Sequence, residues 1–592
     1  MKNAPTPVLV LDGDMIPSLA VTRSLNRKGI PVDLAHADNI GERPIASYTR
    51  HARKTLTYPD PLSEPASFAE WIQEQLRSET YRLILPVTER TLVVLARHPE
   101  RSAWTEQIPI PPRSALERVL VKSQTLELAE SLGVPYPARE LVTDIARLEQ
   151  LAEDIEYPVV LKPQSSISGG IDSGLAQLSV DYAFNRDELL KKGRNLLERT
   201  VLLLQQYVRG EGVGVELIAE HGEIRLAFQH RRIHELPLSG GGSCYRESVA
   251  VDPALLDASS RLIAALGWHG VAMVEFKRDP RDGRFWLMEI NGRFWGSLPL
   301  SVAAGADFPW LLYRLYTEGT LKDRLPTVRT GIHCRKLADD LTWYEHVARG
   351  VGDPRLFKRP PATRLLGQAL AVFTPGHRFD VQSLRDPRPG LVDLHRIARG
   401  YLRRVTDGLR HQLDKRRRAS PGERRRIARL LAPARRILFV CHGNINRSAL
   451  AEVLSRRLLE GDDIEVRSAG FHPVQGRPAD PNMVACAREQ GVDLGGASST
   501  VLDKQLLDWA DLTFAMETRH LERLRELSPQ ALTKAALLGS LAPDGGDPEI
   551  PDPYGQPAER YAACYARIER CISSLANIVK PDRLDGQSPN AL

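Results

Sequence analysis

Residues 436–458, RILFVCHGNINRSALAEVLSRRL, decide the fold of the C-terminal part of this 592-residue chain. The apolar run Ile437–Val440 predicts a buried strand, and apolar residues at 450, 453, 454 and 458 recur at helical spacing. Between strand and helix lies a short polar loop that begins with Cys441 and ends with Arg447. The stretch therefore predicts a strand, a tight loop and a helix N-terminus in direct succession, the start of an α/β unit.

The loop from Cys441 to Arg447 has the chemistry of an anion-binding nucleophile site. Successive backbone N–H groups of such a loop can point into its centre, and a helix N-terminus adds about half a positive charge. With Arg447 and the Ser448 hydroxyl, these donors favour a thiolate at Cys441 and also fit a phosphate dianion. We therefore predict attack of sulfur on phosphorus, giving a phosphocysteine that water hydrolyses.

The leaving group of such a reaction needs a proton, so a carboxylic acid is expected on another loop. Asp552 in IPDPYG (550–555) is the candidate, because prolines restrict the backbone on both of its sides. A DPYG sequence by itself is an ordinary turn. Its occurrence downstream of the Cys441 loop favours a catalytic role.

Together these motifs resemble those of low molecular weight protein tyrosine phosphatases. The similarity covers residues 435–580 and rests on C-x5-R-S at 441–448, SAG at 468–470, GxPxDP at 476–481, WAD at 509–511 and DPY at 552–554. It implies Cys441 as nucleophile, Arg447 as phosphate clamp and transition-state stabiliser, Asp552 as general acid, and no cofactor. It also implies a phosphate loop made of His442, Gly443, Asn444, Ile445, Asn446 and Ser448.

Within this resemblance, Asn444 would hold the shape of the loop and Ser448 would support the thiolate. Asn446 stands where many relatives carry a second cysteine, so a protective disulfide inside the loop is not expected. Arsenate reductases share the loop but need further cysteines before the acid loop, and none lies between Cys486 and Asp552. Cys564 and Cys571 lie beyond the acid loop and are expected to be core residues.

In the N-terminal part, two acidic residues are expected to face each other across a hairpin. Strand-like segments flank the turn-forming RDPRDGR at 278–284, and a hairpin centred there pairs Glu275 with Glu289. Residues two apart on a strand share a face, so Asn291 and Arg293 would point the same way as Glu289. Two carboxylates and an amide oxygen suit Mg²⁺ shared with nucleotide phosphates.

Basic residues and a hinge accompany this hairpin. Lys162 ends the strand-like YPVVLKP and precedes an expected flexible loop at 164–170, where backbone N–H groups can cover a polyphosphate. Lys122 lies forty residues earlier. Residues 203–212, LLQQYVRGEG, have the pattern of a strand followed by a hinge that could hold an adenine.

In this order, residues 5–325 resemble the ATP-grasp superfamily, in particular its carboxylate–amine (or carboxylate–thiol) ligases. The resemblance implies ATP and Mg²⁺, with Glu275, Glu289 and Asn291 as metal ligands and Arg293 stabilising phosphoryl transfer. ATP would be bound by Lys122, Lys162, Gln205, Gln206, Tyr207, Val208 and Glu211. Arg231, Arg232 and the loop 239–243 are candidates for holding the acid substrate, although a plain surface loop is an equal alternative at 239–243.

Composition narrows the class of protein. With 42% hydrophobic and 26% charged residues and ordinary Gly and Pro usage, collagen-like and disordered chains are excluded. No apolar run approaches the roughly 20 residues that span a bilayer, the N-terminus lacks a signal-peptide pattern, and six cysteines are too few for a disulfide scaffold. We expect a cytoplasmic protein without stable membrane insertion.

Charge is concentrated in one segment. Residues 399–436 carry fourteen Lys or Arg and three acidic residues, a net +11, whereas the whole chain is only +6. The rest of the chain is therefore −5 and mildly acidic. No base-reading motif accompanies the basic run, so nucleic acid is not an expected partner, and the run is taken as a solvated helix or linker.

These patterns predict an α/β chain with five parts. They are a pre-ATP-grasp α/β domain (1–113), a two-lobed α+β ATP-grasp domain (114–325), its C-terminal extension (326–400), a basic linker (401–434) and an α/β phosphatase domain with a central parallel sheet (435–582). The expected partners are ATP, a small carboxylic acid with an amine or other nucleophile, and a phosphotyrosine protein or small phosphomonoester. The alternative is that only the phosphatase is active and the ATP-grasp part is a nucleotide-binding sensor or scaffold.

Overall fold

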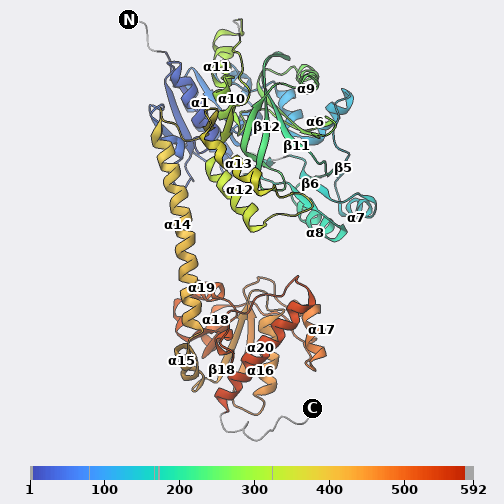
Figure 1. Ribbon diagram of the computed structural model, residues 1–592, viewed down its shortest axis with the longest axis vertical. Coiled ribbons are helices and arrows are strands. Elements are labelled where there is room, and N and C mark those ends of the chain that lie inside the picture. Colours follow the sequence, from blue (N-terminus) through green and yellow to red (C-terminus); the bar gives the residue numbers. More distant parts are fainter. Residues whose placement is uncertain (1–4, 79, 166, 171–173, 323–324, 581–592) are drawn as a thin grey trace. The chain divides into compact units, whose positions relative to one another are not determined.

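The computed structural model describes residues 5–78, 80–165, 167–170, 174–322 and 325–580. The chain forms two compact units, Met1–Ala398 and Arg399–Leu592. The long helix α14 (Pro387–Arg418) runs through the boundary between them (Figure 1). Within the described ranges, no helix combines the length and apolarity that a bilayer crossing requires. The five predicted domain boundaries stay predictions.

The first unit begins with a parallel sheet in the order β3-β2-β1-β4. Its central strand β1 is fully apolar and buried, which is typical of parallel sheets covered on both faces. Their bounds are β1 (Val8–Val10), β2 (Val32–Ala37), β3 (Thr55–Tyr58) and β4 (Leu83–Leu85). The helices of this part are α1 (Ile16–Arg27), α2 (Pro65–Arg77), α3 (Glu89–Arg97), α4 (Arg101–Trp104) and α5 (Arg113–Leu120).

Two further sheets build the predicted two lobes. A small sheet in the order β5-β10-β6-β9 contains β5 (Arg139–Val142), β6 (Val159–Pro163), β9 (Asp181–Ala183) and β10 (Leu202–Gln206). A seven-stranded sheet in the order β15-β14-β11-β12-β13-β16-β17 contains β11 (Glu211–Glu220), β12 (Glu223–Leu236), β13 (Gly242–Val249), β14 (Gly270–Arg278), β15 (Phe285–Asn291), β16 (His333–Arg335) and β17 (His377–Phe379).

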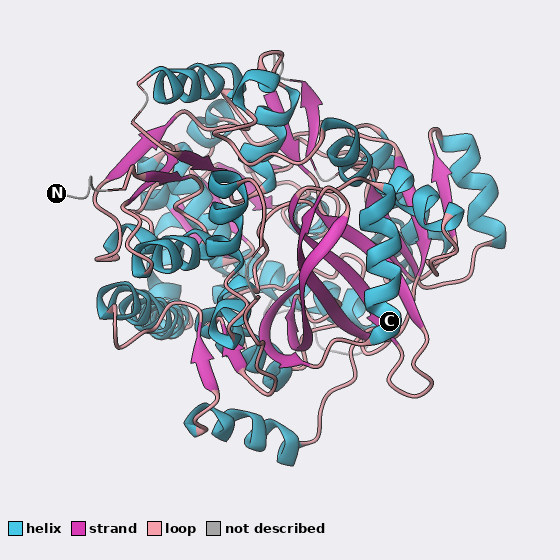
Figure 2. Ribbon diagram, turned by 90° about the horizontal axis from the view of Figure 1, so that it is seen from above, coloured by secondary structure: helices cyan, strands magenta, loops and turns pink. Residues whose placement is uncertain are grey.

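Helices lie around the strands (Figure 2). Those of the two lobes are α6 (Lys122–Ser131), α7 (Ile145–Asp154), α8 (Arg186–Leu197), α9 (Pro253–Ala265), α10 (Leu298–Ala304), α11 (Phe308–Glu318), α12 (Leu337–Arg349) and α13 (Ala362–Leu370). The segment after Lys162, expected as a flexible loop, contains strand β7 (Ile167–Gly170), which pairs with β8 (Gly174–Gln177). Residues 166 and 171–173 lie outside the described ranges.

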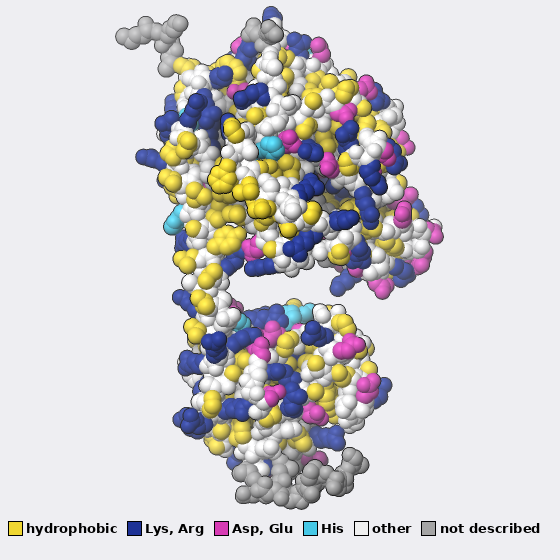
Figure 3. Space-filling model, in the orientation of Figure 1, with side chains coloured by type: hydrophobic (Ala, Val, Ile, Leu, Met, Phe, Trp, Pro, Cys, Tyr) yellow, Lys and Arg dark blue, Asp and Glu magenta, His cyan; other side chains and the backbone are white. Residues whose placement is uncertain are grey.

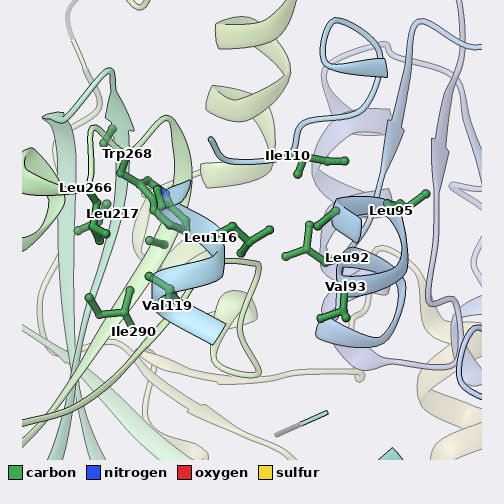
Figure 4. Packing of buried hydrophobic residues seen from close by; sticks show 14 of the residues in the cluster. Leu92, Val93, Leu95, Ile110, Leu116, Val119, Leu217, Leu266, Trp268 and Ile290 are labelled. Atoms are coloured by element: carbon green, nitrogen blue, oxygen red, sulfur yellow. The ribbon is translucent and has the colours of Figure 1, made fainter. Parts of the chain in front are cut away.

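One core joins the first sheet's helices to the seven-stranded sheet. Leu92 on α3 and Leu116 on α5 belong to the same buried cluster as Trp268 and Ile290 (Figure 4). At about 25 cal/mol per Å² of apolar surface, burial on this scale dominates the stability of the unit. The predicted first two domains therefore pack as one body.

The second unit contains a parallel sheet in the order β19-β18-β20-β21. It confirms the predicted α/β class with a central parallel sheet. The strands are β18 (Arg436–Cys441), β19 (Glu465–Gly470), β20 (Leu512–Ala515) and β21 (Ala535–Leu537). The helices are α15 (Pro421–Leu431), α16 (Arg447–Leu458), α17 (Pro481–Glu489), α18 (Lys504–Trp509), α19 (Thr518–Leu527) and α20 (Ala558–Val579). Cys564 and Cys571 on α20 are buried in its core, as predicted.

The basic segment is helical, and its second half is part of this unit. Ile427 and Leu431 on α15 are 0% and 2% exposed and lie in the core cluster of the second unit. By contrast, Leu402 and Leu409 on α14 are 65% and 56% exposed, and hydrophobic side chains are visible on the surface of this helix (Figure 3). The charge of this segment predicted a solvated helix or linker. It did not indicate that α15 packs into the core, because the few apolar residues of α15 lie between arginines in the sequence.

Replacing Ile427 with alanine should lower the free energy of unfolding of the second unit by about 2–5 kcal/mol, because a buried aliphatic side chain leaves a cavity. The urea dependence of thiol labelling at buried Cys571 measures this in the full chain. Leu409→Ala, on an exposed position, is the matched control and should stay within about 0.5 kcal/mol. Equal effects of the two substitutions would contradict the assignment of α15 to the core.

Candidate functional sites

Cys441 lies at the end of β18, at the mouth of a loop that closes at the N-terminus of α16. Its side chain is 2% exposed. The Sγ atom lies 3.0 Å from Ser448 Oγ and accepts a hydrogen bond from the Asn444 backbone N–H at 3.2 Å. Hydrogen-bond donors at this distance, together with the helix N-terminus, stabilise an ionised sulfur.

Asn444 fixes the conformation of the loop. Its backbone has φ +52°, a left-handed conformation that asparagine tolerates better than most residues. Its Nδ2 donates to Ser448 Oγ at 2.9 Å and Ser468 Oγ at 2.8 Å, and its Oδ1 accepts from the Thr500 N–H at 2.7 Å. A Cβ on Gly470 would approach the Asn444 backbone N to 2.9 Å, so a glycine is needed there.

Arg447 is fully buried, and its guanidinium joins the loop to two other segments. Nη1 donates to the Ile550 carbonyl at 2.9 Å and to Glu517 Oε1, and Nη2 donates to Asp552 Oδ2 at 2.6 Å. Burial opposes the charge, but the nearby Cys441 and Asp552 raise the pKa of Arg447 above its ordinary value. The structure thus brings together the nucleophile, clamp and acid candidates.

Of the other predicted loop residues, Asn446 is buried, whereas His442 is exposed and its Nδ1 lies 3.3 Å from Arg523 Nη1. Gly443 O accepts from Arg477, and Ile445 O accepts from the Asp480 N–H at 2.9 Å. Arg477 and Asp480 therefore bind the backbone carbonyls of the loop on its outer side.

Glu517 is a residue of this site that sequence reasoning missed. Burial tends to raise the pKa of Glu517, but its hydrogen bonds with Arg447 and Arg519 hold that pKa below its ordinary value. A signal was present: Glu517 follows β20, the parallel neighbour of β18, and the carboxyl ends of adjacent parallel strands form binding sites.

In the first unit, the predicted hairpin pairing is confirmed. Glu275 on β14 lies directly opposite Glu289 on β15. Asn291 Nδ2 lies 3.0 Å from Glu275 Oε1 and 3.3 Å from Glu289 Oε1, and Arg293 Nη2 donates to Asn291 Oδ1 at 2.9 Å. A Cβ on Gly292 would come 2.5 Å from the Trp268 ring, so the backbone packs tightly beside these polar groups.

Glu275 and Glu289 fit a magnesium ion that would be bound by these carboxylates and by the phosphates of a nucleotide. Mg²⁺ typically takes one or two protein carboxylates and completes its shell with phosphates and water. Within the described ranges, no cluster of three or more His, Cys, Asp or Glu side chains offers a metal site formed by protein alone. Arg232 Nη2 pairs with Glu275 Oε2 at 2.5 Å, so this arginine neutralises one of the two acids.

The two predicted lysines are buried near these acids. Lys122 lines a cavity together with Glu289, Asn291 and Arg293. Burial lowers the pKa of Lys162 to about 8; Glu289 opposes this shift and Lys122 adds to it. Burial by itself would raise the pKa of Glu289, but Lys122 and Lys162 hold it below its ordinary value.

Gln205 is the predicted hinge residue with the clearest sign of a ligand. It is 1% exposed, and neither of its amide atoms has a hydrogen-bond partner among the described residues. Strand pairing sets it against Val160, two residues before Lys162, so Gln205 and Lys162 share one face of the small sheet. Buried amides are normally bonded, so this group suits the polar edge of a nucleobase.

The remaining hinge candidates differ from Gln205 in exposure and contacts. Gln206 is exposed, and Val208 is half-buried. The Tyr207 hydroxyl donates to the Leu356 carbonyl at 3.4 Å, and Glu211 lies 3.9 Å from Arg231.

Known proteins match both units. Residues 436–585 match the family model "Low molecular weight phosphotyrosine protein phosphatase", and residues 198–339 match "ATP-grasp in the biosynthetic pathway with Ter operon". The low molecular weight protein-tyrosine-phosphatase Wzb of Escherichia coli K12 is 36% identical over 148 residues, which are 25% of this chain and 97% of that protein. A protein-arginine-phosphatase of Geobacillus stearothermophilus is 35% identical over 149 residues, 25% of this chain and 98% of that protein.

Solved structures are similar to each part separately. Vibrio vulnificus Wzb in complex with benzylphosphonate covers 24% of this chain and 98% of its own, with 34% identity and a TM-score of 0.23. The L-amino acid ligase from Bacillus licheniformis covers 56% of this chain and 79% of its own, with 15% identity and a TM-score of 0.42.

ATP binding should depend on pH through Lys162. Below its pKa of about 8 this lysine is charged, and above it the ammonium is lost, whereas an ordinary lysine stays charged beyond pH 9. ATP phosphates favour the charged form, so binding near pH 8.5 should take up a proton and affinity should fall as pH rises further. Calorimetry in buffers of different ionisation enthalpy measures the uptake. Lys162→Arg should abolish it, and equal uptake in both proteins would contradict this assignment.

Proposed function

We propose that Cys441 performs the hydrolysis of a phosphomonoester. The premise is that this chain belongs, through residues 436–585, to the low molecular weight phosphotyrosine protein phosphatase family. The contact between Arg447 and Asp552 carries the proposal, because it brings the clamp and the acid to the mouth of the Cys441 loop. The chain is an enzyme that also contains an ATP-grasp module.

In the proposed reaction, Cys441 Sγ attacks phosphorus and the P–O bond to the leaving group breaks. The loop N–H groups and Arg447 bind the non-bridging oxygens, where charge must be stabilised in the transition state. Asp552 gives its proton to the leaving oxygen. Water then attacks the phosphocysteine and gives one proton to the Asp552 carboxylate, the P–S bond breaks, and inorganic phosphate leaves with the thiolate and the acid restored.

Glu517 keeps Arg447 available in this scheme. With Glu517 on Nη1 and Asp552 on Nη2, the guanidinium is held before the substrate arrives. A phosphate oxygen would replace Asp552 on Nη2, while the contacts on Nη1 keep the guanidinium in place. A phosphotyrosine protein or a small phosphomonoester is the proposed substrate, and a phosphoarginine protein is the competing class, since relatives of both names are similar to this domain.

For the first unit we propose ATP-dependent ligation of a carboxylic acid to an amine or other nucleophile. The carboxylate would take the γ-phosphoryl group of ATP, giving ADP and an acyl phosphate that the nucleophile then displaces. Lys122 and Lys162 would bind the phosphates, Gln205 would bind adenine with the neighbouring hinge residues, and Arg293 would stabilise the transferring group. Mg²⁺ on Glu275 and Glu289 would supply charge neutralisation of the phosphates.

The acid substrate would lie near Arg232. This arginine pairs with Glu235 and Glu275 and donates to the Gly241 carbonyl at 3.2 Å, so it connects the acidic pair to the glycine-rich loop at 239–243.

A nucleotide-binding sensor without turnover is the alternative for this unit. A cytoplasmic location is proposed from the six thiols, which form no disulfide among the described residues.

Cys441→Ser should reduce hydrolysis of p-nitrophenyl phosphate by at least about 10³-fold, because the hydroxyl is a far weaker nucleophile at neutral pH. Asp552→Asn should lower kcat/KM for phenyl phosphate by about 10²-fold or more and for p-nitrophenyl phosphate much less, since a good leaving group needs little proton transfer. Steady-state assays of both esters measure this. Retained activity in Cys441→Ser, or equal losses for both esters in Asp552→Asn, would contradict these roles.

Glu289→Gln should lower Mg-ATP-dependent ADP release about 10- to 100-fold in a screen of carboxylic acids with amine acceptors, because a metal ligand and a phosphate-facing charge are lost. Glu223→Gln, an exposed glutamate on β12, is the matched control and should release ADP like the wild type. ADP release that is unchanged in Glu289→Gln would favour the sensor alternative or a different metal site.

A further inference from the structure

Lys415, at the end of α14, makes ion pairs with the segment that carries the proposed acid. Its Nζ lies 2.6 Å from Glu549 Oε2 and 3.0 Å from Asp547 Oδ2. One helical turn earlier, His411 Nε2 lies 3.7 Å from the same Glu549 oxygen. Lys415 precedes the matched phosphatase domain at 436–585, so the family model does not account for these contacts.

Glu549 is more than a surface partner for this lysine. Its side chain is 14% exposed, and its Oε1 accepts a hydrogen bond from the Thr518 backbone N–H at 2.7 Å, at the start of α19. The preceding residue on that segment is Glu517, which holds Arg447. Lys415 therefore contacts a carboxylate that also fixes the helix start beside the arginine clamp.

Ile550, the residue after Glu549, contacts the arginine clamp. The Ile550 N–H donates to the Met516 carbonyl at 2.8 Å, and the Ile550 carbonyl accepts from Arg447 Nη1 at 2.9 Å. Asp552 follows two residues later and binds the other arm of the same guanidinium. Glu549, the residue that Lys415 contacts, therefore directly precedes Ile550, whose carbonyl binds the clamp.

We propose that Lys415 is a positioning residue for the acid loop of the phosphatase. It joins the carboxylates of Asp547 and Glu549 and so sets where Asp552 meets the leaving group. This inference rests on the proposed phosphatase function. It assigns a part of that function to the helix that precedes the domain, whose basic character otherwise suggests a solvated linker.

Charge explains why the contact matters. Asp547 and Glu549 lie two residues apart, and without a cation their like charges repel each other. The hydrogen bonds and charge of Lys415 help to hold the pKa of each carboxyl below its ordinary value, against the effect of burial. Without Lys415, Glu549 would turn towards water and loosen its contact with Thr518. An acid displaced by about 1 Å loses much of its effect on proton transfer.

The test compares two esters in the full-length protein. In Lys415→Met, kcat/KM for phenyl phosphate should fall about three- to tenfold, and for p-nitrophenyl phosphate less than about twofold, because a poor leaving group depends on the acid and a partly exposed ion pair has a modest effect. Lys415→Arg should restore both values. Arg416→Met, on the exposed neighbouring residue, should behave like the wild type.

The outcomes separate this inference from the function on which it rests. Equal losses for both esters, matched by a lower unfolding temperature, would assign Lys415 a merely structural role and overturn the proposal. An unchanged ratio of the two esters in Lys415→Met, or the same change in Arg416→Met, would also overturn it. A wild-type protein without Cys441-dependent hydrolysis would remove the phosphatase function itself, and this inference with it.

Discussion

The buried guanidinium of Arg447 is the constraint on which the C-terminal site depends. A buried charge is tolerated only when it is paired and hydrogen-bonded, and this one is 0% exposed. Its partners come from two separate segments: Glu517 after β20, and Ile550 and Asp552 on the acid loop. Satisfying one side chain therefore fixes the relative positions of the nucleophile loop and the acid.

In the proposed ATP site, too, buried charges are stabilised by neighbouring charges of opposite sign. There, Lys162 and Lys122 are buried beside Glu289, so each charge reduces the cost of burying the others. Arg232 does the same for Glu275. In both units, charges that are paired within the protein occupy the place where a phosphate, with its own charge, would exchange partners.

Local patterns predicted the parts of both sites that lie close together in sequence. The Cys441 loop could be predicted because strand, loop and helix are contiguous, and the pairing of Glu275 with Glu289 followed from the position of one turn. Glu517 could be found only once the order of the parallel strands was known, and Lys415 could not be found from the sequence. Their roles arise from contacts between distant segments, and neither residue stands in a distinctive local motif.

The basic segment illustrates the same limit. Its composition suggests a linker, but Ile427 and Leu431 place α15 in the core of the second unit, because their burial stabilises the helix there while Arg425 and Arg429 stay exposed. Gln205 is the converse case. It lies in a segment predicted as a hinge, yet only the structure reveals that its amide is buried without a partner among the described residues.

The most direct test of the account is a crystal structure of the full chain soaked with tungstate. The account predicts a tungsten peak inside the loop 441–448, with Cys441 Sγ facing the metal atom and Arg447 donating to two of its oxygens. A loop without tungsten at a concentration that inhibits hydrolysis, or a Cys441 side chain turned away from the bound oxyanion, would contradict it.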